Sequence, residues 1–279
     1  MTQILKKEQL SEQVYRFRID APHIAKRRKA GQFIMVRANN HSERLPLTIA
    51  NASKDDGWIE IIFQTIGAST TELGLLNEGE HVSDLAGPLG KPTHIENFGR
   101  ALCIGGGVGI APLYPIVTAL KEAGNDVSTI IGARNKGLLI LEQEMQAQSH
   151  KLFVATDDGS YGQKGFVSDI FKQLLAEGQK FDFCVVIGPA PMMKATTVLT
   201  VGAGIKTFAS LNPIMIDGTG MCGGCRVTVF GETKFACVDG PEFDAAGIDW
   251  DSMLKRLGSY REFEQKAKDK HICQLGTEQ

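Results

Sequence analysis

The chain lacks any long apolar run. No uncharged apolar stretch approaches the roughly 18 to 20 residues that cross a bilayer, and residues 1–17 lack the apolar core of a secretion signal. The charges nearly cancel, since 30 Lys and Arg stand against 32 Asp and Glu, which leaves a formal net charge of -2. Such a balance gives no general attraction for a polyanion or an anionic membrane surface. We therefore expect a cytoplasmic protein that binds neither nucleic acid nor membrane.

Cysteine is also scarce. Six cysteines in 279 residues are too few for a disulfide scaffold in a chain of this length without a secretion signal. Three of them are isolated in the sequence, whereas Cys222, Cys225 and Cys237 cluster. The cluster is the first indication of metal chemistry.

The chain does have the length of roughly two ordinary domains. Up to about residue 89, short alternating apolar runs such as residues 58–63 are separated by turn residues, which is typical of an antiparallel β-barrel or sandwich. From about residue 99, apolar strand candidates alternate with segments long enough for helices, which predicts a parallel α/β sheet. These strand candidates are residues 101–104, 127–131, 152–155 and 183–187.

These patterns predict an antiparallel β-barrel at 1–97, a parallel α/β domain at 98–205 and a small C-terminal region at 206–279. We expect a helix over about residues 251–270, docked on the chain's own domains or on a partner. Its candidate buried face is spaced mostly by three to four residues and consists of Met253, Leu254, Leu257, Tyr260 and Phe263. The basic run at residues 26–29 is expected to be a solvated turn.

A glycine-rich turn follows the first expected α/β strand. Residues 105–112 read GGGVGIAP and lead into a helical pattern. Missing side chains let the backbone approach a pyrophosphate, and the N–H groups and dipole of the helix favour its negative charge. The alternative is that glycine only relieves crowding where strand and helix meet.

The cysteine cluster has the spacing D-x4-C-x2-C-x11-C from Asp217 through Cys222 and Cys225 to Cys237. The plant-type 2Fe-2S pattern is C-x4-C-x2-C with a distant fourth cysteine, so Asp217 stands where the first thiolate would be. The sequence favours a 2Fe-2S cluster on these four residues. Zinc is the alternative, although no second C-x2-C or His pair is present, and reduced structural cysteines are another. An Asp before Gly is also a common turn former.

With Pro112 included, the glycine turn resembles that of the ferredoxin reductase-like flavoproteins. Segments that follow later strands, at residues 132–134 and 188–193, fit the same family. In the barrel, residues 44–48 (RLPLT) are similar to the family segment that grips FAD. This implies that Arg44 pairs with the pyrophosphate and that Thr48 reaches the flavin ring. Leu47 then stands where plant-type members carry a stacking aromatic residue.

The turn at residues 67–71 resembles the second flavin loop of the family, with an ordinary hairpin as the alternative. The resemblance further places Asp157 and Asp158 beside the nicotinamide. The cofactor-binding residues it implies are Arg44, Leu45, Pro46, Leu47, Thr48, Gly67, Ser69, Thr70, Gly106, Gly107, Val108, Gly109, Ala111, Pro112, Arg134, Asp157, Asp158, Gly188, Pro189 and Met192.

The order of barrel, glycine turn and cysteine loop resembles one family of small electron-transfer subunits. It includes those of NADH-dependent ferredoxin:NADP oxidoreductase, sulfide dehydrogenase and dihydroorotate dehydrogenase, and Asp217 places the chain nearer the first two. The resemblance implies an NAD(P)H-dependent flavin oxidoreductase subunit with FAD, a 2Fe-2S cluster and NAD(H).

NADP(H) is the alternative nucleotide, because Arg134 and Lys136 could meet a 2′-phosphate. The implied partner is a larger subunit with a second flavin and 4Fe-4S clusters, in a heterodimer or larger assembly that exchanges electrons with ferredoxin indirectly. No residue is implied as a catalytic acid or base. A dihydroorotate dehydrogenase subunit is the alternative function. A non-catalytic 2Fe-2S redox sensor is another, but it leaves the flavin and nucleotide motifs unexplained.

Overall fold

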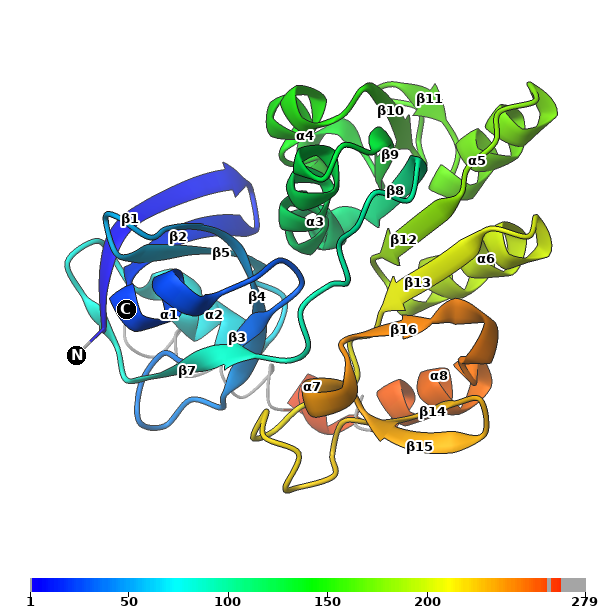
Figure 1. Cartoon of the computed structure of the whole chain (residues 1–279). Helices are drawn as coiled ribbons and strands as arrows, with labels where there is room; N and C mark the ends of the chain where they lie inside the picture. Colours follow the sequence, from blue (N-terminus) through cyan, green and yellow to red (C-terminus); the bar gives the residue numbers. More distant parts are fainter. Residues whose placement is uncertain (1, 260–261, 267–279) are drawn as a thin grey trace.

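The computed structural model describes residues 2–259 and 262–266 and contains a barrel, an α/β domain and a C-terminal region (Figure 1). Alternating apolar residues in the first third build one antiparallel sheet in the order β6-β1-β2-β5-β4-β3-β7. This sheet is the nearly closed barrel that the sequence predicts. Its strands are β1 (Thr2–Ser11), β2 (Val14–Asp20), β3 (Phe33–Arg37), β4 (Leu45–Ser53), β5 (Trp58–Gln64), β6 (His81–Val82) and β7 (Asp84–Leu89), with helices α1 (Pro22–Arg27) and α2 (Ala68–Leu75).

The second sheet has the order β11-β10-β9-β8-β12-β13-β16, and its pairs are parallel except for β13 with β16. The four apolar runs predicted as strands are confirmed as β8, β9, β10 and β12. Helices α3 and α4 pack on one face, and α5 and α6 on the other (Figure 1). The elements are β8 (Arg100–Gly106), α3 (Ile110–Glu122), β9 (Asp126–Ala133), α4 (Glu142–Gln148), β10 (Lys151–Thr156), β11 (Gln163–Lys164), α5 (Val167–Ala176), β12 (Phe183–Ile187), α6 (Ala190–Gly202), β13 (Lys206–Ser210) and β16 (Glu242–Asp244), with 3-10 turns η1 (Gly107–Gly109) and η2 (Lys136–Leu138).

The C-terminal region adds the hairpin β14 (Arg226–Val229) and β15 (Glu232–Phe235), then α7 (Ala236–Asp239), η3 (Ala245–Gly247) and α8 (Trp250–Gly258). Strands β13 and β16 follow the expected division at 205/206 but belong to the α/β sheet, so the two regions share that sheet.

Helix α8 packs on the chain itself through buried Met253 and the half-buried Leu254 and Leu257. Phe263 is 68% exposed, so its predicted place on a buried face is wrong. Tyr260 and residues 267–270 of the predicted helix lie outside the described residues.

Strand β3 belongs to two cores at once. Ile34 and Val36 lie in the core of the barrel, whereas Phe33 and Met35 lie in a core formed with the α/β domain and the C-terminal region. This division follows from strand geometry, because successive side chains point to opposite faces. One face of β3 therefore helps to join the barrel to the rest of the chain.

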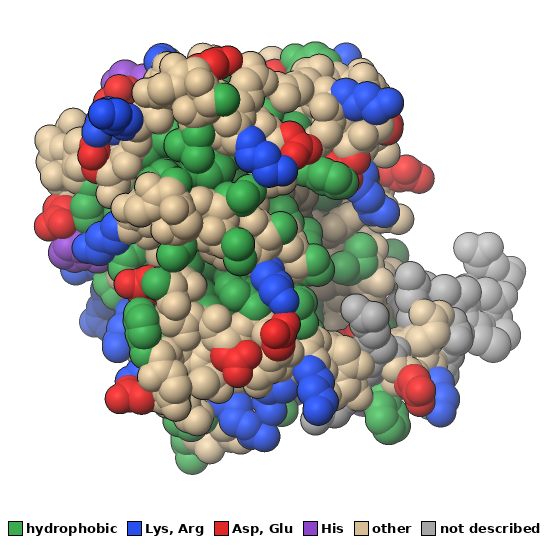
Figure 2. Space-filling model, turned by 90° about the vertical axis from the view of Figure 1, so that its right-hand side faces the viewer, with side chains coloured by type: hydrophobic (Ala, Val, Ile, Leu, Met, Phe, Trp, Pro, Cys, Tyr) green, Lys and Arg blue, Asp and Glu red, His purple; other side chains and the backbone are tan. Residues whose placement is uncertain are grey.

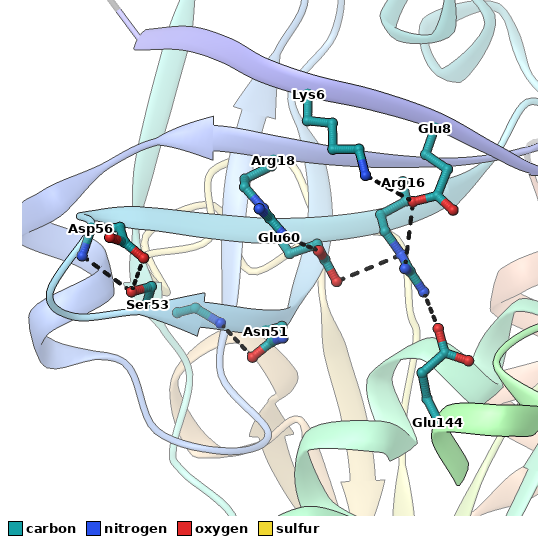
Figure 3. A network of polar contacts seen from close by, with 10 residues as sticks. Lys6, Glu8, Arg16, Arg18, Asn51, Ser53, Asp56, Glu60 and Glu144 are labelled. Atoms are coloured by element: carbon teal, nitrogen blue, oxygen red, sulfur yellow. Dashed lines mark hydrogen bonds and ion pairs between the residues drawn. The ribbon is translucent and has the colours of Figure 1, made fainter. Parts of the chain in front are cut away.

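A polar network joins the barrel to the α/β domain (Figure 3). Arg16 of β2 donates through Nη2 to Oε1 of Glu144 on α4 at 2.8 Å, and its Nε lies 3.6 Å from Oε1 of Glu60 on β5. Glu60 is buried, and Arg18 also faces it at 3.5 Å. Burial raises the pKa of Glu60, and the two arginines oppose that rise. The pair of Arg16 and Glu144 fixes α4 against β2.

The surface carries both signs of charge. On the face in Figure 2, Lys and Arg side chains are interspersed with Asp and Glu, and hydrophobic side chains gather between them. Among the described residues, no helix is both long enough and apolar enough to cross a membrane. The basic run at residues 26–29 ends α1 and is not a simple turn: Lys26 and Arg27 are exposed, but Arg28 is half-buried.

Candidate cofactor sites

The segment predicted to hold FAD runs along β4. Thr48 pairs with Phe33 of β3, and Pro46 pairs with Met35. Cross-strand partners share a face, so Pro46 and Thr48 lie on the outer face of the barrel, toward the α/β domain and the C-terminal region. Leu45 and Leu47 pack against the barrel core instead. The contact of Leu47 with a flavin ring stays a prediction.

Arg44 lies just before β4, where its guanidinium meets a carboxylate of β7. Its Nε and Nη2 donate to Oδ2 of Asp84 at 2.8 and 2.6 Å. Both side chains remain partly exposed, at 48% and 32%, and exposed pairs of this kind stabilise a fold by less than about 1 kcal/mol. Arg44 therefore remains available to an anionic ligand.

The turn at residues 67–71 begins helix α2, so the alternative of an ordinary hairpin is wrong. Gly67 is the N-cap, and the Thr70 hydroxyl accepts the N–H of Gly67 at 3.0 Å. This hydroxyl is occupied in capping the helix, so the first-turn N–H groups and Ser69 are the donors left for a phosphate. Ser42, which lies two residues before Arg44, donates to Glu72 of α2. Arg44 and the start of α2 are thus held on neighbouring segments.

The predicted nucleotide turn spans the end of β8, η1 and the start of α3. It faces the turn from β12 to α6, so the carboxyl ends of the two central strands meet. A Cβ on Gly109 would lie 2.7 Å from the Cα of Gly188 and 2.8 Å from the carbonyl oxygen of Ile187, so only glycine fits there. Met192 packs against Gly106 and Gly188. Strand order reverses between β8 and β12, and such a switch point is where open α/β sheets bind ligands.

This turn gathers most of the predicted nucleotide residues. Val108 is exposed at its tip, Ala111 is buried in the first turn of α3, and Pro189 is the N-cap of α6. Gly107 has a φ of +57°, and Pro112 lies within the first turn of α3.

Arg134 and the two aspartates come together at the ends of β9 and β10. The N–H of Asp158 donates to the Arg134 carbonyl at 3.2 Å. The Asp158 carboxylate accepts the N–H of Ser160 at 2.9 Å, and hydrogen bonds from Ser160 lower its pKa. The side chain of Asp158 therefore serves its own turn, and a role for either aspartate at the nicotinamide stays a prediction.

The cysteine loop holds its four predicted ligands as two pairs. The Sγ atoms of Cys225 and Cys237 are 3.2 Å apart, and both residues are buried. Asp217 accepts the N–H of Cys222 through Oδ2 at 3.0 Å and that of Thr219 through Oδ1 at 2.8 Å. Asp217 is thus a turn former, and each carboxylate oxygen keeps a lone pair. Within the described part of the chain, no three acidic, His or Cys side chains converge on one metal position.

The chemistry of the donors fits an iron–sulfur cluster. Burial and the Cys225 thiol raise the pKa of Cys237 to about 12. A thiol of this kind becomes a thiolate at neutral pH only beside a strong positive charge such as a metal ion. Cys222, by contrast, is exposed on the loop. The site accordingly has two buried sulfurs and one sulfur at the surface.

The three candidate sites adjoin one another. Turn η1 contacts β5, and α3 packs on β4, the strand of the flavin segment. Gly218 of the cysteine loop has a φ of +77°, and a Cβ there would lie 2.7 Å from Cγ of Met35 on β3. The cysteine loop thus rests on the strand next to β4.

Sequence reasoning missed Asp84, Glu72 and Met35. Asp84 and Met35 meet predicted site residues, and Glu72 meets Ser42, only through tertiary packing, so no local motif marks these contacts. The one available signal for Met35 was its place in an alternating strand beside the flavin segment.

Three family models cover most of the chain. An oxidoreductase FAD-binding domain matches residues 1–94, an oxidoreductase NAD-binding domain matches 103–197, and the iron–sulfur cluster binding domain of dihydroorotate dehydrogenase B matches 212–249. Together with the fold, they define an iron–sulfur flavoprotein of the ferredoxin reductase type. It is an NAD(P)H-dependent flavin oxidoreductase subunit with FAD, NAD(H) and an iron–sulfur cluster as cofactors.

Relatives of known class match the whole chain. A homologue of the dihydroorotate dehydrogenase B (NAD(+)) electron transfer subunit from Thermotoga maritima is 48% identical over 99% of this chain and 97% of its own. The subunit of Geobacillus thermodenitrificans is 32% identical over 88% and 96%. A solved structure of the NADH-dependent reduced ferredoxin-NADP oxidoreductase is similar with a TM-score of 0.93 and 46% identity over 98% of both chains. The chain belongs to the family of dihydroorotate dehydrogenase B electron-transfer subunits and their homologues.

Proposed function

We propose that this chain is the NADH-oxidising subunit of a larger electron-transfer complex of the ferredoxin:NADP oxidoreductase kind. The observation that carries the proposal is the packing around β3. The flavin segment on β4 lies on one side of Met35, and the loop of Gly218 lies against its side chain. Adjacent strands are about 4.8 Å apart, so one strand separates the two sites.

In this proposal the chain's residues position the cofactors and supply no proton. Arg44 and the start of α2 hold the FAD phosphates, Thr48 faces the flavin ring, and the turn at Gly109 holds the pyrophosphate of NADH. FAD held there would supply two-electron hydride chemistry toward NADH and one-electron chemistry toward an iron–sulfur acceptor. Packing of α3 on β4 and of η1 on β5 brings the nucleotide turn to the barrel. We retain the division into an FAD part (1–97), a nucleotide part (98–205) and a cluster part (206–279).

We assign the cluster as 2Fe-2S, with Asp217, Cys222, Cys225 and Cys237 as ligands. A carboxylate is a harder and less electron-donating ligand than a thiolate, so its ligation raises the reduction potential. Asp217→Cys should lower that potential and change the visible spectrum, whereas Asp244→Asn, a carboxylate change in β16, should change neither. Identical spectra and potentials in wild type and Asp217→Cys would remove Asp217 from the ligand set.

The proposed partner is a larger subunit with a second flavin and 4Fe-4S clusters, through which electrons reach ferredoxin or NADP. The loop around Cys222 supports such a contact, because Ile216, Met221 and Val238 are 61%, 90% and 40% exposed. Exposed apolar side chains grouped at a redox site favour docking of another protein. The reduced thiols of this loop favour the cytoplasm as its compartment.

The second candidate is an electron-transfer subunit of dihydroorotate dehydrogenase, the class to which several relatives belong. Asp217 in place of a thiolate favours the first candidate. Orotate-dependent oxidation of the assembled complex would favour the second.

The deciding experiment is anaerobic stopped-flow absorbance of the FAD- and cluster-loaded chain mixed with NADH or NADPH. We expect flavin bleaching by NADH, followed by loss of the cluster band. Cys237→Ser serves as a matched variant, in which flavin bleaching should persist while the cluster signal disappears. Faster bleaching by NADPH would reassign the nucleotide. A cluster-loaded chain without flavin or without bleaching would support a redox sensor instead.

A further inference from the structure

A cavity of about 650 Å³ lies where the barrel, the connecting segment and the α/β domain meet. Its walls come from α1, the second half of β4, residues 92–95 and the exposed side of α3. None of its lining residues belongs to the predicted flavin, nucleotide or cluster sites. Cavities of this size hold ligands as large as a nucleotide.

The charged side chains that line the cavity are mostly cationic. Arg28, Lys29 and Lys54 face it together with His94, and Glu122 is its one acidic side chain. Three fixed cations against one carboxylate leave two positive charges uncompensated, and His94 pairs with Glu96, which lies outside the lining, at 3.2 Å. A phosphate monoester carries about two negative charges at neutral pH. The charge of the lining therefore matches one phosphate group.

Arg28 is the most buried of the charged residues that line the cavity. It is half-buried at the end of α1, and burial lowers its pKa while Glu122 opposes the effect. Within the described residues, its guanidinium has neither a hydrogen bond nor an ion pair. A guanidinium has five N–H donors arranged for planar oxyanions, and in the described part of the chain those of Arg28 are neither bonded nor fully withdrawn from solvent. Its neighbours Lys26 and Arg27 on the same helix are exposed.

Much of the rest of the cavity wall is apolar, although Asn51 and Tyr114 also line it. Ala30, Ala50, Ile95 and Pro115 line it, while the hydroxyls of Thr93 and Thr118 are already bonded to Glu242 and to the Tyr114 carbonyl. A cationic rim beside an apolar wall suits a molecule with a charged group and an uncharged body.

We infer that this cavity is a binding site for a small phosphate-bearing metabolite, distinct from the cofactor sites. An occupant would touch α1 and β4 of the barrel, the segment at 92–95 and α3 at the same time. Binding would therefore stabilise one arrangement of the two domains, and with it the approach of the nucleotide turn to β4.

The test is titration calorimetry of the FAD-loaded full chain with inorganic pyrophosphate, with NAD⁺ saturating the nucleotide site. We expect Arg28→Gln/Lys54→Gln to weaken binding at least 10-fold, because two charged hydrogen-bond donors to the phosphate are lost. Lys26→Gln/Arg27→Gln removes the same charge from α1 outside the cavity and should change the affinity less than about threefold. FAD content and thermal melting establish that each variant is folded.

Glu122→Gln provides an independent arm, because removing the one acidic wall residue should tighten pyrophosphate binding several-fold. No heat of binding with the wild type, or equal weakening in the two double variants, would overturn the proposal. If Arg28→Gln/Lys54→Gln fails to fold, the Glu122→Gln result decides: tighter binding supports the site, and unchanged or weaker binding rejects it. Neither titration measures flavin bleaching by NADH, so a negative result for pyrophosphate binding would leave the proposed function unaffected.

Discussion

Glu242 lies where the barrel, the connecting segment and β16 meet, and it makes stability depend on pH. Its Oε1 accepts a hydrogen bond from the Thr93 hydroxyl at 2.6 Å, and a Cβ on Gly31 would lie 2.7 Å from the same oxygen. Burial raises the pKa of Glu242 from 4.5 to about 7. In the folded chain this carboxyl therefore holds its proton at pH values where the unfolded chain has lost it.

The sign and size of the effect follow from that difference. A carboxyl whose pKa is raised in the folded chain does not lower the free energy of unfolding below about pH 4.5, where both states are protonated. As the pH rises toward 7 the unfolded chain loses this proton while the folded chain keeps it, so the free energy of unfolding falls. One pKa unit corresponds to about 1.4 kcal/mol, so the loss is at most about 3 kcal/mol, reduced by the partial exposure of the residue. Glu242→Gln keeps the acceptor for Thr93 without the charge.

We therefore expect Glu242→Gln to be more stable than wild type by about 2 to 3 kcal/mol at pH 8 and nearly equal to it at pH 4.5. Denaturant unfolding of the FAD-loaded chain, measured from pH 4.5 to 8.5, checks this. Glu232→Gln, a change at an exposed carboxylate of β15, should show the same pH dependence as wild type. Parallel curves for wild type and Glu242→Gln would refute the reasoning.

Three further changes test the other contacts. Arg44→Gln should weaken FAD binding about 10- to 100-fold by equilibrium dialysis, since a charged hydrogen-bond donor is lost, whereas Asp84→Asn should leave it unchanged or tighter. Gly109→Ala should slow flavin reduction by NADH at least 10-fold in stopped flow while the FAD content stays the same. The reason is that the added Cβ meets backbone atoms of the opposite turn. Unaltered kinetics would contradict the close contact between Gly109 and Gly188. Arg16→Met should lower the free energy of unfolding by about 2 to 4 kcal/mol, because buried Glu60 loses a partner, and Glu144→Gln by less than about 1; equal losses in denaturant titration would show that Glu60 is not the reason.

The sequence predicted the strands and turns that are determined by residues close together in the chain. Strands β8, β9, β10 and β12 match apolar runs within two residues at each end, because parallel strands covered by helices on both faces are mostly apolar. The glycine turn before α3 was predicted from its place between an apolar run and a helical pattern, whereas the close approach of Gly109 to Gly188 is a tertiary contact that no local pattern marks.

Contacts between distant segments left no such pattern. Antiparallel β16 joins the α/β sheet from the C-terminal region, and the half-burial of Arg28 depends on α3 lying beside α1. The turn at Gly67 could be a hairpin or a helix start by composition alone, because glycine and hydroxyl residues serve both. Capping by Thr70 decides between them only once the helix has formed.

The two-sided packing of β3 bears on how this chain could be recombined with its relatives. A barrel cut out at residue 97 would expose Phe33 and Met35, which are now 3% and 1% accessible, while the remaining chain would lose the surface on which Gly218 rests. Exchange of the barrel alone would leave exposed apolar side chains on the barrel and a cysteine loop without its supporting strand on the remaining chain. A substitution on the outer face of β3 must therefore be compatible with the barrel and also with the α/β domain and C-terminal region that pack against it.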